Sequence, residues 1–208
     1  MIAIITGDII NSEKNIPQEW MPVLKGYFSK LGHGPKDWEI YRGDEFQIKT
    51  KPEKALAIAI SIKALVKSLK GLDVRMSIGF GNETYVGNSV SESNGTAYQR
   101  SGRFFDKLKK EKLNLIVATG IEELDKELNF VLRLALDFMD NWSPVSAEIV
   151  AMVLNNPSIS QTEMATILHI QQSAISQRQK RARLDLVLEL LDYYNTLIKK
   201  VPNDTTVY

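Results

Sequence analysis

The sequence predicts an α+β N-terminal domain followed by an all-helical C-terminal domain. Residues 1–137 alternate between strand-like and helix-like hydrophobic patterns, whereas everything beyond residue 143 has helical spacing. A turn-rich stretch, Asp140-Asn141-Trp142-Ser143-Pro144, separates the two parts. We therefore expect one domain at 1–142 and a second at 143–208.

The N-terminal elements follow from hydrophobic spacing. An apolar run opens the chain and ends in the polar residues Thr6-Gly7-Asp8, which is typical of a buried strand followed by a turn. A proline-led helix, two hairpin strands, a second helix and an alternating strand follow at 17–31, 38–41, 46–50, 52–69 and 72–80. The last three elements are a helix, a strand and a helix at 91–112, 113–119 and 121–137.

Two βα units that flank a hairpin predict an antiparallel-centred sheet with helices on one face, the ferredoxin-like arrangement. There the first strand and the hairpin are neighbours, so Asp8 would face Asp44 in the hairpin tip. Two carboxylates about 4 Å apart repel by roughly 4 kcal/mol at an effective dielectric of 20, which favours Mg²⁺ bridged to phosphate oxygens. Gly7 and Gly43 directly precede the aspartates, and glycine lets backbone approach a ligand closely.

These residues also have simpler interpretations. Aspartates after strands and in hairpin tips are common solvent-facing turn residues. Glu45 is a weaker metal-ligand candidate than Asp44, because adjacent strand residues point to opposite faces. Three aromatic residues near the hairpin can stack on a base or pack in the sheet: Trp38, Tyr41 and Phe46.

Composition limits the chemistry. The chain has no cysteine and only two histidines, His33 and His169, which excludes disulfides, thiolate catalysis, sulfur-ligated zinc and a histidine-rich metal site. A metal would have to be a hard cation held by oxygen. The formal charge of +1 gives no global reason to expect nucleic acid or membrane. No signal-peptide core and no apolar stretch of about 20 residues is visible, so we expect a soluble cytoplasmic protein.

Three segments carry a family resemblance. ITGDIINS (5–12), RGDEFQ (42–47) and RMSIGFG (75–81) resemble, in order and spacing, the core motifs of class III nucleotidyl cyclase and GGDEF palm domains. This resemblance implies a palm domain in which Asp8 and Asp44 hold Mg²⁺ and the hairpin contacts a nucleotide. Arg42 stands where the GGDEF hairpin has its first glycine.

The stretch from Gly95 to Leu108 is similar to the cyclase segment in which an Asn and an Arg steady the reacting phosphates. Matched on Gly95, those catalytic roles would be held by Gln99 and Arg103, with Gln99 replacing the asparagine. Arg103 can equally be a solvated helix residue, and Arg100 is close enough in sequence to take a phosphate role instead. The whole chain most resembles the SatD family of bacterial proteins, which implies an architecture more than an activity.

The C-terminal part resembles the helix-turn-helix of bacterial regulators. Ser160 and Glu163 form a capping-box signature at the start of a helix at 161–168, and a turn at 169–171 leads into a long helix at 173–200. Polar side chains able to read base edges, and then cations able to contact phosphates, follow this turn: Gln172, Ser173, Ser176, Gln177, Arg178, Lys180, Arg181 and Arg183. Because His169 replaces the usual turn glycine, a helical bundle used for protein contact remains an alternative.

An apolar face follows Arg183 at 184, 187, 188, 191, 194, 197 and 198. This face either seals the domain or forms the seam of a homodimer, which would suit a two-fold DNA site. We therefore predict a DNA-binding regulatory protein whose N-terminal domain binds a divalent metal and a nucleotide, and whose ligand occupancy changes DNA affinity. The rivals are an active Mg²⁺-dependent nucleotidyl cyclase or nucleotidyltransferase regulated by the C-terminal domain, and an adaptor that binds protein.

Overall fold

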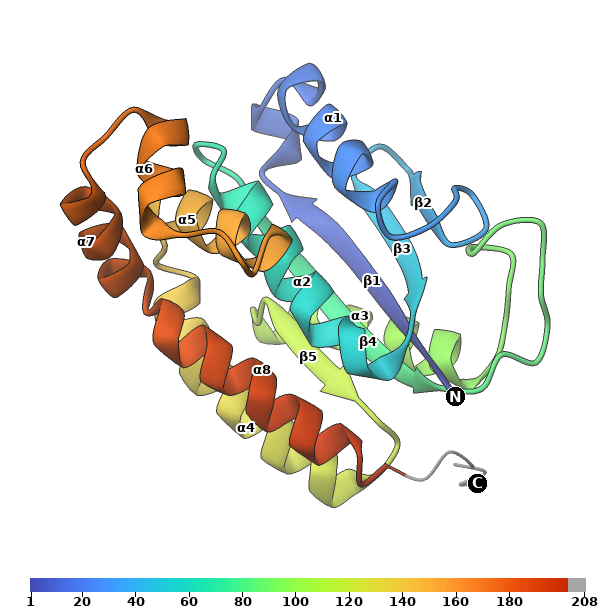
Figure 1. Cartoon of the computed structure of the whole chain (residues 1–208). Coiled ribbons are helices and arrows are strands. Elements are labelled where there is room, and N and C mark those ends of the chain that lie inside the picture. The colour runs from blue at the N-terminus through green and yellow to red at the C-terminus, as the bar shows by residue number, and fades with distance from the viewer. Residues whose placement is uncertain (202–208) are drawn as a thin grey trace.

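A five-stranded mixed sheet lies at the centre of the computed structural model, which describes residues 1–201 apart from the side chain of Lys109 (Figure 1). The strand order is β2-β3-β1-β4-β5. Strand β1 is antiparallel to β3 and β4, β2 is antiparallel to β3, and β5 is parallel to β4. The strands are β1 (Ile2–Ile10), β2 (Trp38–Tyr41), β3 (Glu45–Thr50), β4 (Asp73–Gly81) and β5 (Leu115–Ala118).

Helices surround this sheet, so the predicted α+β class is confirmed. Within residues 1–201, none of them combines the length and the apolar composition that crossing a bilayer requires. A short 3-10 helix, η1 (Ser12–Lys14), follows β1. The α-helices are α1 (Pro17–Phe28), α2 (Pro52–Lys67), α3 (Thr96–Glu111), α4 (Glu122–Met139), α5 (Pro144–Asn155), α6 (Gln161–Leu168), α7 (Gln172–Ala182) and α8 (Leu184–Ile198).

The first strand is longer than predicted. Its pairing with β4 continues through Asp8 to Ile10, so Asp8 lies inside the strand and the expected turn at 6–8 is wrong. The reason is that Ile9 continues the alternate positions Ala3 and Ile5 that face the main core, where it packs at 2% exposure. Asp8 is therefore held by neighbouring strands on both sides rather than by a loop.

Helices α1 and α2 share one core with one face of the sheet, which agrees with the expected arrangement. The prediction that all helices lie on this face is wrong for α3, which packs on the opposite face. Two buried hydroxyl contacts fix it there: Ser101 Oγ donates to Thr6 Oγ1 at 2.7 Å, and Ser77 Oγ donates to the Ser101 carbonyl at 2.6 Å. Small polar residues at alternate positions of β1 and β4 thus form a second surface on which a helix can pack.

The main core runs across the predicted domain boundary at 142/143. It joins residues of the sheet, α1 and α2 with residues of α4, α5 and α8. Tyr194 of α8 is fully buried, donates a hydrogen bond to the Pro52 carbonyl at 2.6 Å and meets the ring of Phe80 edge-on. The apolar face of α8 therefore seals the fold, as one of the two interpretations of that face expected. Residues 202–208 of the predicted second domain lie outside the described part.

The predicted long C-terminal helix is two helices. The chain breaks at Arg183, whose φ of +53° is left-handed, and α8 begins at Leu184. Trp142, buried beside this junction, donates its indole N–H to the Ala182 carbonyl at 2.8 Å. This bond satisfies a carbonyl that an uninterrupted helix would have paired internally, so the tryptophan stabilises the bend.

A buried lysine ties the end of α4 to α2 and β4. The Lys63 side chain on α2 is fully buried, and its Nζ lies 2.8 Å from Asp73 Oδ1 and 2.6 Å from Asp140 Oδ1. The shorter contact lacks hydrogen-bond alignment at Asp140 Oδ1 and is a purely ionic one. Lys67 adds contacts of 3.2 Å to Asp73 and 2.7 Å to the Asp140 carbonyl. Two cations and two anions from α2, β4 and the end of α4 therefore neutralise one another.

We expect Lys63→Met to lower the free energy of unfolding by roughly 3 kcal/mol, because removing one partner of a buried ion network leaves the others uncompensated. Urea unfolding measured by circular dichroism tests this. Lys126→Met is the matched control: Lys126 pairs with Glu122 and Glu123 at the surface and its loss should change stability little. Equal effects of the two substitutions would contradict the structural role of Lys63.

Candidate functional site

The charged hairpin tip predicted from the sequence is present. Tyr41 pairs with Glu45 in register, and the three residues between them form the turn. Arg42 and Gly43 both have positive φ, +51° and +92°, so this turn uses the left-handed conformation that glycine tolerates best. The Ile9 amide donates to the Asp44 carbonyl at 3.3 Å, which places the turn against the end of β1.

A row of polar side chains crosses four strands beside this turn. Tyr41, Glu45, Asp8 and Arg75 are successive register partners on β2, β3, β1 and β4, and directly opposed residues share a face of the sheet. Arg75 holds Asp8 with two hydrogen bonds, from Nε at 3.1 Å and from Nη2 at 3.0 Å. Burial, and then the nearby Glu45 carboxylate, raise the pKa of Tyr41. We call these four residues the polar row; they bring polar and charged side chains together at the hairpin end of the sheet.

The two predicted aspartates differ in their surroundings. Asp44 lies in the turn, and its Oδ2 accepts a 2.5 Å hydrogen bond from the hydroxyl of Ser12 on η1. Glu45, the weaker candidate from the sequence, shares the face and the register of Asp8. The sequence predicted that only one of Asp44 and Glu45 would face the site, because adjacent strand residues point to opposite faces. The residue that lies opposite Asp8 in register is Glu45 and not Asp44.

The predicted nucleotide-binding residues have structural explanations as well. A Cβ on Gly7 would lie 2.5 Å from the Phe46 ring and 2.8 Å from Met76 Cγ, so glycine is required there by packing on the core face. A Cβ on Gly43 would meet nothing, and its positive φ accounts for the glycine. Arg42 is exposed and lies 3.8 Å from Glu45 Oε2. Trp38 and Phe46 pack against Phe28 in the core, which favours the packing interpretation for both.

The carboxylates at this end of the sheet suit a metal ion only if a bound ligand supplies further oxygen atoms. In the part of the chain that the structure describes, no three acidic or histidine side chains gather into a metal cluster. Mg²⁺ bound with phosphates commonly takes only one or two carboxylates, and Asp8 and Asp44 are oxygen donors of that kind on adjacent elements. Arg75 supplies a positive charge beside Asp8.

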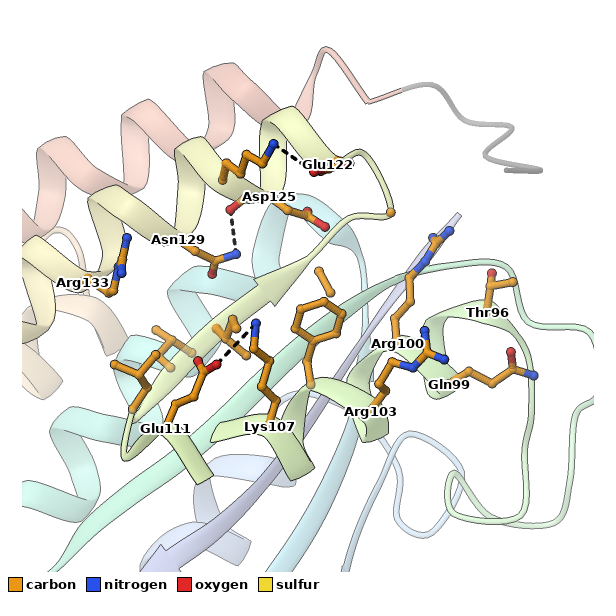
Figure 2. A pocket seen from close by; sticks show the side chains of 17 residues that line it. Thr96, Gln99, Arg100, Arg103, Lys107, Glu111, Glu122, Asp125, Asn129 and Arg133 are labelled. Atoms are coloured by element: carbon orange, nitrogen blue, oxygen red, sulfur yellow. Dashed lines mark hydrogen bonds and ion pairs between the residues drawn. The ribbon is translucent and has the colours of Figure 1, made fainter. Parts of the chain in front are cut away.

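The residues predicted to steady phosphates lie elsewhere. Gln99 and Arg103 are on α3 and line a groove of about 980 Å³ between α3, β5 and α4 (Figure 2). None of Asp8, Asp44 and Glu45 lines this groove. Gln99 Nε2 reaches Asn94 Oδ1 at 3.5 Å, whereas Arg103 is exposed. The structure thus separates the two groups of site residues within one chain.

Asp125 is the acid that lies deepest in this groove. Its Oδ1 accepts hydrogen bonds from the amide and the hydroxyl of Thr119, both at 2.6 Å. Burial raises the pKa of the Asp125 carboxyl, and the Thr119 hydrogen bonds and the charge of Arg100 oppose this only in part. Arg100 Nη1 donates to the Phe80 and Thr119 carbonyls at 2.7 and 3.1 Å. Arg100 is thus a structural clamp between β4 and the end of β5.

Helices α5, α6 and α7 form a small core of their own from Ile149, Met164, Ala165 and Ile175. The predicted capping box is present, since the Ser160 hydroxyl accepts from the Glu163 amide and the Glu163 carboxylate accepts from the Ser160 amide. His169 takes the left-handed conformation, with φ of +52°, between α6 and α7. His169 therefore adopts the left-handed conformation for which a glycine is usual in this turn.

The predicted DNA-binding side chains are not equivalent. Arg178 lies 3.3 Å from Glu148 on α5, so its charge is already paired. Gln172 donates to the Gln161 side chain on α6. The other candidates lie on the outer side of α7, Ser176 half-buried and the rest exposed: Ser173, Ser176, Gln177, Lys180 and Arg181.

Sequence reasoning missed Arg75 and Ser12. Arg75 stands between the buried residues Val74 and Met76, so strand alternation alone places it on the face of Asp8. The signal was therefore available in the segment 75–81. For Ser12 no comparable periodicity exists, because it belongs to a 3-10 turn whose approach to Asp44 depends on tertiary packing.

The geometry defines an α+β protein with a row of polar side chains at the hairpin end of its sheet and a helical C-terminal part. The family model of the SatD family matches residues 1–198, so the chain belongs to the SatD family. No curated protein matches the chain.

The raised pKa of Asp125 predicts a pH-dependent effect of Asp125→Asn. Because the carboxyl binds its proton more tightly in the folded state, its stabilising contribution is complete below the unfolded pKa and is lost as the pH rises through the folded pKa. The variant has no such loss, so its stability relative to wild type should increase from pH 4 to pH 7 in urea unfolding. Asp137→Asn, at an exposed position of α4, is the control. A stability difference that is constant with pH would contradict the prediction.

Proposed function

We propose that this chain is a DNA-binding regulatory protein whose N-terminal part binds a nucleotide together with Mg²⁺. The observation that carries the first half is the α5–α6–α7 unit with its own apolar core, capping box and left-handed turn. In helix-turn-helix proteins the second helix enters the major groove with its start facing the bases. Here that helix is α7.

The surface of α7 supports this proposal. Ser173 and Gln177 are exposed donors and acceptors one helical turn apart, suited to base edges. Lys180 and Arg181 follow on the exposed side and suit phosphates. Arg178 contributes to the fold through Glu148 rather than to the interface. A homodimer would present two such helices to a two-fold site, and this too is a proposal.

The strand order and the polar row support the second half. Strands β4-β1-β3-β2 follow the order of a split βαβ sheet, the ferredoxin-like order found in palm domains. In the proposed complex Asp8 and Asp44 hold Mg²⁺ on phosphate oxygens, and Arg75 stands beside Asp8. Mg²⁺ would neutralise phosphate charge there. Turnover of the nucleotide, as in a cyclase, is the alternative function, and Gln99 and Arg103 lie away from Asp8 within one chain.

Lys180→Ala combined with Arg181→Ala should weaken DNA binding. Each lost phosphate contact reduces the slope of log K against log salt by roughly 0.9, so the pair should reduce it by about 2. A gel shift with the DNA upstream of the protein's own coding sequence, repeated over salt concentration, measures this. Lys30→Ala with Lys54→Ala removes the same charge from exposed positions elsewhere. Failure of the wild type to retard DNA at low salt, or equal slopes for both double variants, would refute the DNA-binding proposal.

ATP or GTP with Mg²⁺ should stabilise the wild-type protein more than the nucleotide with EDTA does. At a ligand concentration 100 times Kd the gain is about 2.7 kcal/mol, which a thermal-shift assay detects easily. Asp44→Asn should remove the Mg²⁺-dependent part of this gain, whereas Asp192→Asn, on the exposed side of α8, should leave it unchanged. If Asp44→Asn retains the full Mg²⁺ effect, the metal site is not where we place it.

A further inference from the structure

The groove between α3 and α4 carries more positive charge than its own acids neutralise. Helices α3 and α4 form the two sides of the groove, and β5 runs between them (Figure 2). Among the side chains that the structure describes, five cationic and three acidic ones line it: Arg100, Arg103, Lys107, Lys126 and Arg133, and Glu111, Glu122 and Asp125. The whole chain, by contrast, has a formal charge of only +1. A local surplus of this kind attracts anions.

The pairing inside the groove leaves two arginines for a ligand. Lys107 pairs with Glu111 at 3.5 Å, and Lys126 pairs with Glu122 at 2.9 Å. Neither Arg103 on α3 nor Arg133 on α4 makes an ion pair or a side-chain hydrogen bond within residues 1–201, leaving aside any contact of the Lys109 side chain. Both are exposed, and Figure 2 places Arg103 toward the end of the groove that holds Gln99 and Arg133 toward the end that holds Glu111.

Arg100 adds a third positive charge near Arg103. Its Nη1 is occupied by two carbonyl oxygens, which are neutral acceptors and leave the positive charge largely in place. Arg100 and Arg103 rise from α3 into the same end of the groove (Figure 2). Guanidinium groups suit phosphate because their planar donors match its oxygens in pairs.

The floor of the groove is apolar. Leu115, Ile116 and Ala118 of β5 form it, and Phe104 of α3 lines it beside them. Phe104 is partly buried, and Lys107 Nζ lies 5.7 Å from its ring centre. An aromatic ring at the base of a cationic cleft offers a surface on which a flat ligand ring can stack.

The dimensions favour a small molecule over a polymer. A volume of about 980 Å³ lies within the range of roughly 300–1,000 Å³ that is usual for small-ligand clefts. We infer that this groove binds a nucleoside polyphosphate, with the phosphates on Arg100 and Arg103 at one end of the groove and the base on Phe104. This site is separate from the one proposed around Asp8 and Asp44.

Isothermal titration calorimetry with ATP and GTP in EDTA tests this inference, because chelation removes any binding that depends on Mg²⁺. The wild type should show saturable binding of at least one of the two nucleotides. Arg100→Ala with Arg103→Ala should weaken it at least tenfold. Lys30→Ala with Lys54→Ala, which removes equal charge elsewhere, should stay within twofold of wild type. Circular dichroism confirms that each variant is folded.

Phe104→Leu distinguishes a nucleoside ligand from phosphate alone. The substitution keeps an apolar side chain and removes the aromatic face, so it should weaken the nucleotide severalfold and leave inorganic tripolyphosphate unaffected. No saturable nucleotide binding in EDTA, equal weakening by the two double variants, or equal losses for nucleotide and tripolyphosphate in Phe104→Leu would each overturn the inference. None of these outcomes decides the Mg²⁺-dependent site, which the thermal-shift comparison of Asp44→Asn tests separately.

Discussion

The buried Lys63 ammonium holds the end of α4, from which the helical C-terminal part continues, against α2 and β4. Taking an ion out of water costs several kcal/mol unless partners replace its hydration, so Asp73 and Asp140 must stay beside it. Asp73 begins β4 and Asp140 follows α4. Asn114, just before β5, also donates to Asp140 Oδ2 at 3.0 Å. The start of the helical part is thereby fixed against the sheet by charge as well as by apolar packing.

This attachment constrains how the proposed ligand could change the proposed DNA binding. Helix α5 packs on α2 and α7 packs on α5, so α7 is connected to the sheet through two helix contacts rather than a loose linker. A hinge between independent domains would need a smaller shared core than this chain has. The regulation that we propose would therefore act through small shifts of packed helices, or through the arrangement of two chains on DNA.

Elements whose signal is local were predictable from the sequence, and those that depend on distant partners were not. The range 161–168 of α6 matches its prediction because the capping box marks its start. The break at Arg183 was missed because Trp142, whose indole stabilises it through the Ala182 carbonyl, lies 40 residues before Ala182. The placement of α3 was missed because hydroxyl pairs between Ser101, Ser77 and Thr6 carry no hydrophobic period. The position of Arg75 could have been predicted, because polar and apolar residues alternate strictly around it in β4.

The position of Arg75 changes which residue is expected to act beside the carboxylates. The family resemblance assigned a phosphate role to Arg103 through its order along the sequence, but within one chain the guanidinium that meets Asp8 belongs to Arg75. An arginine that holds an aspartate through two hydrogen bonds lowers the negative charge available to a metal. A ligand with Mg²⁺ must therefore compete with Arg75 for Asp8, or draw the arginine onto its own phosphates. Ligand binding at the hairpin end of the sheet would then replace the ion pair between Asp8 and Arg75. Because this ion pair joins β1 and β4, ligand occupancy would change the contact between the two strands.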